Sequence, residues 1–188
     1  MAGQIATVTF ITDALVFIGK TIWHREAFSQ MTRGRAMEIL FICTGNTCRS
    51  AMAEKILNHL ATSRSLDIYA HSAGTRATQG GQMNQAARKA LEEFGITNFL
   101  HSTQPIPDDI TADLILAATS EHRDFVLGEH PELRSKVFTI KEFAQRFQET
   151  DVTNLEIEDP LDSDAETYRQ VANEIKDSLE VIVAGLTT

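Results

Sequence analysis

The chain is acidic and has the composition of an ordinary globular domain. Its 188 residues are 43% hydrophobic and 23% charged, which suits a single domain with a sizeable core. A formal net charge of -9 argues against a nucleic-acid-binding surface, because few basic groups remain to neutralise phosphates over a broad area. Cys43 and Cys48 are the two cysteines of the sequence. They provide no disulfide framework and lack the spacing of zinc ligands, so we expect no metal or other cofactor and a reducing, cytoplasmic compartment.

Residues 1–36 form a candidate N-terminal extension. They contain four basic and two acidic residues, unlike the acidic remainder, so we place the domain in residues 37–188. The stretch 5–23 is apolar, but Asp13 and Lys20 interrupt it and no signal-peptide pattern frames it, which argues against a membrane span. An upstream start codon, a flexible tail, and a helix that lies on the domain or on a partner all remain open.

Strand-like and helix-like patterns alternate from Met37 onward. The predicted strands are 39–42, 66–72, 114–118 and 137–140, and the predicted helices are 51–57, 83–94, 121–127, 141–148 and 165–184. This alternation favours an α/β fold in which a four-stranded parallel sheet carries helices on both faces. Such a flavodoxin-like, three-layer arrangement binds its ligands beyond the carboxyl ends of the strands.

The segment from Cys43 to Ser50 joins the first predicted strand to the first predicted helix. A strand-to-helix turn directs backbone N–H groups and the positive end of a helix dipole toward one point, which makes it a ready anion site. Gly45 and Asn46 are expected to let the turn curl tightly, because glycine and asparagine tolerate backbone conformations that most residues avoid.

Cys43 and Arg49 are the candidate reacting pair in this turn, with five residues between them. The arginine side chain offers a planar fork of donors that matches two phosphate oxygens. A cysteine at a helix N-terminus and beside a cation is stabilised as the nucleophilic thiolate. The pair therefore predicts an in-line phosphoryl acceptor, with the sulfur beneath a tetrahedral oxyanion and the guanidinium beside it.

The run Cys43-Thr44-Gly45-Asn46-Thr47-Cys48-Arg49-Ser50 is a Cys-x5-Arg-Ser motif that follows a strand, and it resembles the loop of the low-molecular-weight protein tyrosine phosphatase family. The resemblance covers residues 37–188 and implies the fold of that family. It also implies a protein phosphatase that forms a phosphocysteine intermediate and acts on a phosphorylated protein. Cys43 would be the nucleophile and Arg49 the phosphate-binding cation, and the remaining loop residues would complete the phosphate-binding loop.

Asp159 is the candidate general acid. A thiolate that attacks phosphorus needs a proton donor for the leaving group, and a carboxyl group on a loop is a usual source. The dipeptide Asp159-Pro160 lies in a polar segment before the last predicted helix, and the family carries its acidic Asp-Pro pair at the corresponding place. The alternative is that Asp159 merely begins a turn, as Asp-Pro pairs often do.

Several side chains are expected to support the loop. Ser50 can donate a hydrogen bond to the Cys43 sulfur, and Asn46 and Ser72 match positions that brace the loop in the family. The chain departs from the family at Ala51, where proline is common, and near Ala86, where our alignment places a frequent histidine. We interpret three histidines as surface or hydrogen-bonded residues rather than as catalytic bases: His71, His101 and His122.

Thr47 and Leu161 bear on the substrate. The position of Thr47 is typically a branched apolar residue in tyrosine-directed relatives and Thr in the protein arginine phosphatase branch. A hydroxyl there can hydrogen-bond the polar phosphoarginine group, and the Asp159 carboxylate can pair with the guanidinium. Leu161 follows the Asp-Pro pair, where tyrosine-directed relatives usually carry aromatic residues. The resemblance therefore favours phosphoarginine, with phosphotyrosine as the alternative.

Two other functions use the same kind of loop. Thioredoxin-coupled arsenate reductases resemble it but relay electrons through further cysteines, and this chain has none after Cys48. A phosphate-binding module that has lost turnover would not need Cys43, Arg49 and Asp159 together. A disulfide between Cys43 and Cys48 as reversible protection against over-oxidation is a further hypothesis. The sequence leaves the oligomeric state open.

Overall fold

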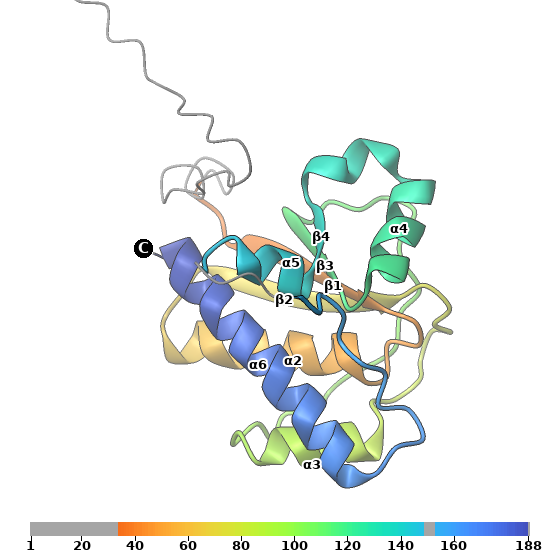
Figure 1. Ribbon diagram of the computed structural model, residues 1–188, viewed down its shortest axis with the longest axis vertical. Coiled ribbons are helices and arrows are strands. Elements are labelled where there is room, and N and C mark those ends of the chain that lie inside the picture. The colour runs from red at the N-terminus through yellow and green to blue at the C-terminus, as the bar shows by residue number, and fades with distance from the viewer. Residues whose placement is uncertain (1–33, 149–152, 188) are drawn as a thin grey trace, which may run out of the picture.

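A four-stranded parallel sheet forms the centre of the domain. The computed structural model describes residues 34–148 and 153–187, and the strands are β1 (Met37–Cys43), β2 (Ile68–Gly74), β3 (Leu114–Ala117) and β4 (Val137–Thr139). Their order in the sheet is β2-β1-β3-β4, and every neighbouring pair is parallel (Figure 1). The central strand β1 therefore ends at Cys43 with a neighbouring strand on each side.

Helices cover both faces of this sheet. One layer contains α2 (Arg49–Ser63), α3 (Gln85–Glu92), α5 (Ile140–Gln145) and α6 (Ala165–Thr187), and the other contains α4 (Ser120–Glu129) and the 3-10 helix η1 (Pro131–Ser135) (Figure 1). Alternate residues of β1 serve the two layers, with Ile39 and Phe41 in one core cluster and Leu40 and Ile42 in the other. A parallel strand buried on both faces requires such a continuous apolar run. The predicted three-layer α/β fold is confirmed.

The ends of several elements differ from the predicted bounds, and capping side chains set the starts of α3 and α5. Ile140 was predicted as the end of a strand, but it begins α5, since Thr139 and Glu142 form a capping box. The helix predicted over 83–94 is shorter because the Asn84 side chain accepts a hydrogen bond from the Ala86 N–H and caps α3. Helix α2 begins at Arg49, two residues earlier than predicted, which places the loop directly against a helix N-terminus.

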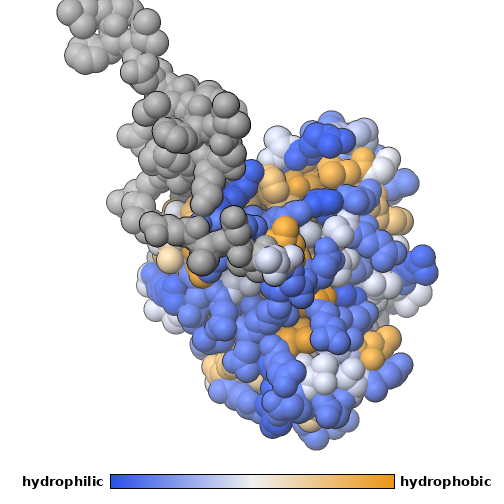
Figure 2. Space-filling model, in the orientation of Figure 1, coloured by the Kyte–Doolittle hydropathy of each residue, from blue (hydrophilic) through white to orange (hydrophobic). Residues whose placement is uncertain are grey.

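The face of the domain seen in Figure 2 is largely hydrophilic, with apolar side chains in small groups. Within the described residues, no helix is both long enough and apolar enough to cross a bilayer. The domain boundary predicted at 36/37 coincides with the start of β1. Just before it, the exposed Arg35 guanidinium pairs with Asp113 at 2.6 Å. The predicted extension is described only from residue 34, so its role stays a prediction.

Candidate active site

The loop from Cys43 to Ser50 lies between the end of β1 and the first turn of α2. Asn46 has a φ of 55°, the left-handed conformation in which asparagine is tolerated. The expectation for Gly45 was wrong, because this residue has no left-handed φ and a Cβ there would meet only Thr47 Oγ1 at 3.6 Å. The loop therefore curls at Asn46 and not at the glycine.

The loop presents a set of free backbone donors. Within the described part of the chain, no acceptor takes a hydrogen bond from the N–H groups of Thr44 through Arg49. Cys48 caps α2 without a side-chain hydrogen bond to the first turn, so the helix N-terminus also keeps its donors free. Buried donors without partners carry a free-energy cost, and an oxyanion in the loop removes that cost while it gains from the helix dipole.

Arg49 brings the cationic group to this loop. Its side chain is 5% exposed. One terminal nitrogen donates to the Asp159 carboxylate at 2.5 Å, and the other donates to the Ile157 carbonyl at 3.2 Å. The Nε donor is buried and has no partner among the described residues. The guanidinium therefore holds a charged donor ready for an anion while it contacts the segment that carries the candidate acid.

A chain of hydrogen bonds connects the Cys43 sulfur to the second strand. Ser50 Oγ lies 3.0 Å from Cys43 Sγ, and the Asn46 amide donates to Ser50 Oγ at 2.9 Å and to Ser72 Oγ at 2.8 Å. Asn46 is fully buried, and its side-chain amide oxygen accepts the Gln104 N–H at 2.9 Å. The structure thus brings together Cys43, Ser50, Asn46 and Ser72 as the sequence suggested. With the sulfur as a thiolate, the Ser50 hydroxyl must be the donor.

His101 braces the loop, a role that the sequence analysis did not assign to it. His101 Nε2 lies 2.7 Å from the Asn46 carbonyl oxygen, so this nitrogen is the donor. Its Nδ1 lies 3.7 Å from Glu54, whose carboxylate also accepts the Ser72 hydroxyl at 2.6 Å. No local pattern singles out His101, because it lies in a segment without regular structure, 55 residues from its acceptor.

His122 is the second histidine that the sequence did not assign to the loop. It is buried on α4, with Nε2 2.8 Å from Thr44 Oγ1 and Nδ1 2.6 Å from Thr119 Oγ1. Burial, and then the positive charge of Arg49, lower the pKa of His122, so the imidazole is neutral near pH 7. The prediction of a hydrogen-bonded histidine is confirmed for His101 and His122, and both hold loop residues.

Cys48 differs from Cys43 in its surroundings. Burial raises the pKa of the Cys48 thiol, and its sulfur lies 3.5 Å from the Tyr168 hydroxyl of α6. Burial also raises the pKa of Tyr168, so both groups stay protonated at neutral pH. Within residues 34–148 and 153–187, no cluster of three or more His, Cys, Asp or Glu side chains could hold a metal.

Asp159 lies beside Arg49, although 110 residues separate them in the chain. Its side chain is 47% exposed, so the carboxyl group contacts both the buried guanidinium and solvent. Its other oxygen accepts the Leu161 N–H at 3.2 Å. Leu161 is 56% exposed, and Thr47 is half-buried with Oγ1 3.5 Å from Cys48 Sγ. The geometry thus gives the two substrate-facing candidates access to solvent.

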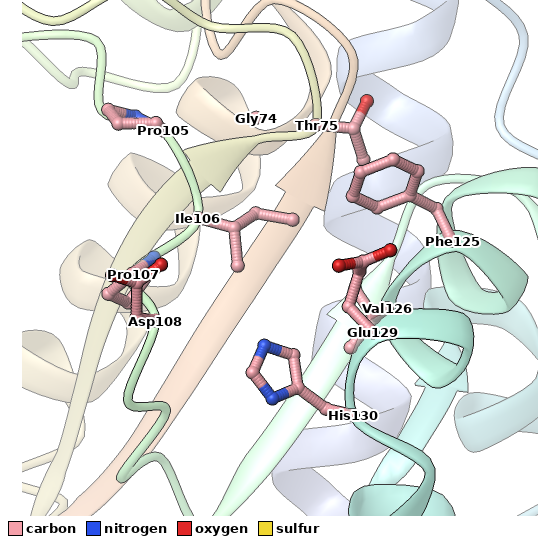
Figure 3. A pocket seen from close by; sticks show the side chains of 10 residues that line it. All are labelled: Gly74, Thr75, Pro105, Ile106, Pro107, Asp108, Phe125, Val126, Glu129 and His130. Atoms are coloured by element: carbon pink, nitrogen blue, oxygen red, sulfur yellow. The ribbon is translucent and has the colours of Figure 1, made fainter.

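A pocket of about 200 Å³ adjoins the loop on the α4 side. Figure 3 shows Thr75 and Phe125 near the strand ends, with Glu129 and His130 farther along the pocket. Thr75 connects it to the loop, because its N–H donates to the Cys43 carbonyl at 2.9 Å. None of Cys43, Arg49 and Asp159 lines this pocket. The three candidate reacting groups are therefore not part of this pocket.

A parallel α/β sheet with a cysteine, an arginine and free N–H groups at the end of its central strand is typical of a cysteine-dependent phosphatase. The comparison with known families agrees with this class. A family model described as low molecular weight phosphotyrosine protein phosphatase matches residues 38–188. The chain therefore belongs to this family and is a protein phosphatase, a hydrolase with a cysteine nucleophile.

Individual relatives fall into two named groups. A protein-arginine-phosphatase of Bacillus subtilis is 32% identical over 152 residues, which are 80% of this chain and 97% of the relative. The low molecular weight protein-tyrosine-phosphatase PtpB of Staphylococcus epidermidis is 30% identical over 146 residues, 78% of this chain and 96% of the relative. A solved structure of YwlE arginine phosphatase, a mutant with a phosphorylated active-site serine, has a TM-score of 0.73 and 30% identity and covers 81% of this chain and 97% of its own.

Proposed function

We propose that the chain removes phosphate from phosphoarginine in proteins through a phosphocysteine intermediate. The observation that carries this proposal is the environment of the loop. The Cys43 sulfur, the unpaired N–H groups of residues 44–49 and the unpaired Arg49 Nε belong to one loop, and the Asp159 carboxyl group lies 2.5 Å from the same guanidinium. A nucleophile, an oxyanion cradle and a proton donor are the three parts that phosphoryl transfer requires.

In the first step the Cys43 thiolate attacks the phosphorus and forms the S–P bond. The P–N bond to the guanidino group breaks as Asp159, in its protonated form, transfers its proton to the leaving nitrogen. The loop N–H groups and Arg49 stabilise the negative charge that develops on the equatorial oxygens. The products of this step are phosphocysteine and a free arginine side chain.

In the second step a water molecule attacks the phosphocysteine. The Asp159 carboxylate takes a proton from the water, the O–P bond forms, and the S–P bond breaks to release inorganic phosphate. Ser50 Oγ, 3.0 Å from the Cys43 sulfur, donates to the departing thiolate and lowers the free energy of that charge. The relative with a phosphorylated serine in its active site supports a covalent intermediate at this position.

Thr47 supports arginine over tyrosine as the substrate residue. Its hydroxyl is half-buried beside Cys48, where a branched apolar side chain would instead offer a contact for an aromatic ring. Leu161, 56% exposed, provides no aromatic wall after the Asp-Pro pair. An Asp159 oxygen already accepts a hydrogen bond from one guanidinium, that of Arg49, and the protonated carboxyl group keeps an acceptor oxygen that can contact the guanidino leaving group in the same way. Relatives named as arginine phosphatases and as tyrosine phosphatases both match the chain, so the residue preference rests on these side chains.

The test compares kcat/KM on a phosphoarginine peptide and on the same peptide with phosphotyrosine. We expect the wild type to favour phosphoarginine and Thr47→Ile to shift the preference toward phosphotyrosine, with Cys43→Ser inactive on both. A wild-type preference for phosphotyrosine would make Thr47 a packing residue and the chain a tyrosine phosphatase. Turnover of neither peptide, with phosphate binding retained, would instead support a binding module, and thiol-dependent reduction of arsenate would support a reductase.

A further inference from the structure

The segment that carries Asp159 is attached to the N-terminus of α4 by a carboxylate. Both oxygens of Glu156 accept the backbone N–H of Ser120, at 3.2 and 3.0 Å. Ser120 is the first residue of α4, so a negative charge meets the positive end of the helix dipole. Glu156 is therefore an anchor between the acid-bearing segment and a rigid element.

Other contacts fix the backbone around this anchor, whereas Asp159 itself is exposed. The Ile157 N–H donates to the Ala118 carbonyl at 2.9 Å, and the Leu155 carbonyl accepts the Thr139 hydroxyl at 3.0 Å. Beyond Ile157, the acid is attached to the rest of the domain by the buried Pro160 that follows it and by the contact of its own carboxylate with Arg49. The Arg49 contact competes with phosphate, because Arg49 is also the cation of the loop. The position of Asp159 during the reaction then depends on Pro160 on one side and on the anchors upstream on the other.

Helix α4 is also the element that holds the nucleophile loop. His122, two residues after Ser120, lies 2.8 Å from the Thr44 hydroxyl, next to Cys43 in the chain. The first turn of α4 thus contacts the loop on one side and Glu156 on the other. A displacement of Glu156 from this turn would alter the distance between the acid and the sulfur, while the loop would keep its own contacts.

We propose that Glu156 is a positioning residue for the general acid. It holds residues 155–159 against the first turn of α4 so that the Asp159 proton reaches the leaving group of a phosphate bound above Cys43. This inference rests on the proposed function, with Asp159 as the acid. Displacements of about 1 Å are known to lower rates by as much as 100-fold when they separate reacting groups.

The experiment measures kcat/KM for two aryl phosphates that differ in leaving group. Phenyl phosphate releases a basic phenolate and needs the proton donor, whereas p-nitrophenyl phosphate releases a stable anion and needs it much less. We expect Glu156→Ala to lower kcat/KM on phenyl phosphate about tenfold and on p-nitrophenyl phosphate less than about threefold. The inhibition constant of inorganic phosphate should not change, because the loop remains intact.

Two variants test whether the effect of Glu156→Ala comes from the lost contact with Ser120 or only from the lost negative charge. Glu158→Ala removes an exposed carboxylate from the same segment, and that carboxylate has no hydrogen bond to a described residue. It should leave the ratio of the two substrates within about twofold of the wild type, since the acid stays in place. Glu156→Gln keeps an acceptor oxygen for the Ser120 N–H and should restore most of the activity on phenyl phosphate.

Ser120→Pro removes the donor instead of the acceptor. Proline is well tolerated at the first position of a helix, and the preceding Thr119 has φ -140° and ψ 165°, which suits a residue before proline. This variant should fold and should reproduce the selective loss of Glu156→Ala. The double variant should be no worse than either single one, because both remove the same contact. Ser120→Ala, which keeps the N–H, is the matched control and should behave as the wild type.

Equal losses on both substrates in Glu156→Ala, or a normal substrate ratio in Ser120→Pro, would overturn the positioning role. If Glu156→Ala fails to fold, the Ser120→Pro ratio alone decides the question. A wild type that hydrolyses neither a phosphoarginine peptide nor either aryl phosphate would refute the proposed phosphatase function itself. A wild type that hydrolyses both, with unchanged variants, would refute only this inference.

Discussion

Replacing Asn46 by alanine tests whether the loop is held by the hydrogen bonds of one buried amide. The side chain donates to Ser50 and Ser72 and accepts from the Gln104 N–H, all at 2.8 to 2.9 Å. The backbone at this residue has a φ of 55°. Alanine removes the three hydrogen bonds and places a Cβ-bearing residue without polar compensation in the left-handed region.

The magnitude follows from these losses. A hydrogen bond contributes about 0.5–1.5 kcal/mol net, and a donor left without a partner, here the Gln104 N–H, adds about 1–3 kcal/mol. The left-handed conformation adds about 1–2 kcal/mol for alanine. Counting the Gln104 bond once, as the unpaired donor, the lower values sum to about 3 kcal/mol. We therefore expect Asn46→Ala to lower the free energy of unfolding by at least about 3 kcal/mol, and the Tm by at least about 6 °C for a domain of this size.

Urea unfolding and thermal melts measure this loss, and kcat/KM on p-nitrophenyl phosphate measures the state of the loop. Asn46→Gly is the control, because glycine loses the same hydrogen bonds without the strain and should recover about 1 kcal/mol. The reasoning is refuted if Asn46→Ala changes the free energy of unfolding by less than about 1 kcal/mol, or if the glycine variant is the less stable of the two.

Two further predictions concern the same loop. Gly74→Ala should lower kcat/KM on p-nitrophenyl phosphate at least about 100-fold with an unchanged far-UV spectrum, because its Cβ would lie 2.5 Å from the Thr44 carbonyl oxygen and 2.9 Å from the Asn46 nitrogen; a variant with normal kinetics would show that the backbone can yield. For His122, burial and then Arg49 lower the pKa in the folded state, so the unfolded chain binds a proton first as the pH falls below the ordinary value near 6.5. The free energy of unfolding should therefore decrease from about pH 7 to pH 5. The same measurement on His122→Asn, by urea unfolding at each pH, should show a smaller decrease. Equal decreases in the two proteins would contradict the prediction.

Local patterns were sufficient to predict the fold. The apolar runs of the strands and the helical spacing of apolar residues between them indicate which face of each element is buried. Such patterns involve only residues that are close together in the chain. The predicted bounds failed where a single side chain decides the outcome. Thr139 ends β4 and begins α5 through its capping box, and periodicity does not detect such a hydrogen bond.

The candidate site shows the same difference between residues that a local pattern predicts and residues that it does not. The loop from Cys43 to Ser50 is contiguous, so its residue types and spacing are enough to indicate an anion site. Asp159 could be named only through the resemblance to a family, since its partner Arg49 is 110 residues away. His101 and His122 were given no role in the loop, because each contacts the loop from a segment that shares no local pattern with it.

The strand order explains why these distant residues meet. In the order β2-β1-β3-β4 the loop follows the central strand, so the segments that follow β2 and β3 necessarily flank it. The segment after β2 supplies Thr75 and, farther along the chain, His101, and the segment after β3 supplies His122 near the start of α4. The acid-bearing segment comes after β4 and α5, and reaches the loop across the same first turn of α4 through Glu156. Any parallel sheet with this order would bring those four segments together, but the side chains that bond across them are chosen by three-dimensional fit. The local sequence is therefore enough to predict the loop, whereas the contacts that hold the loop in place follow from the order of the strands in the sheet.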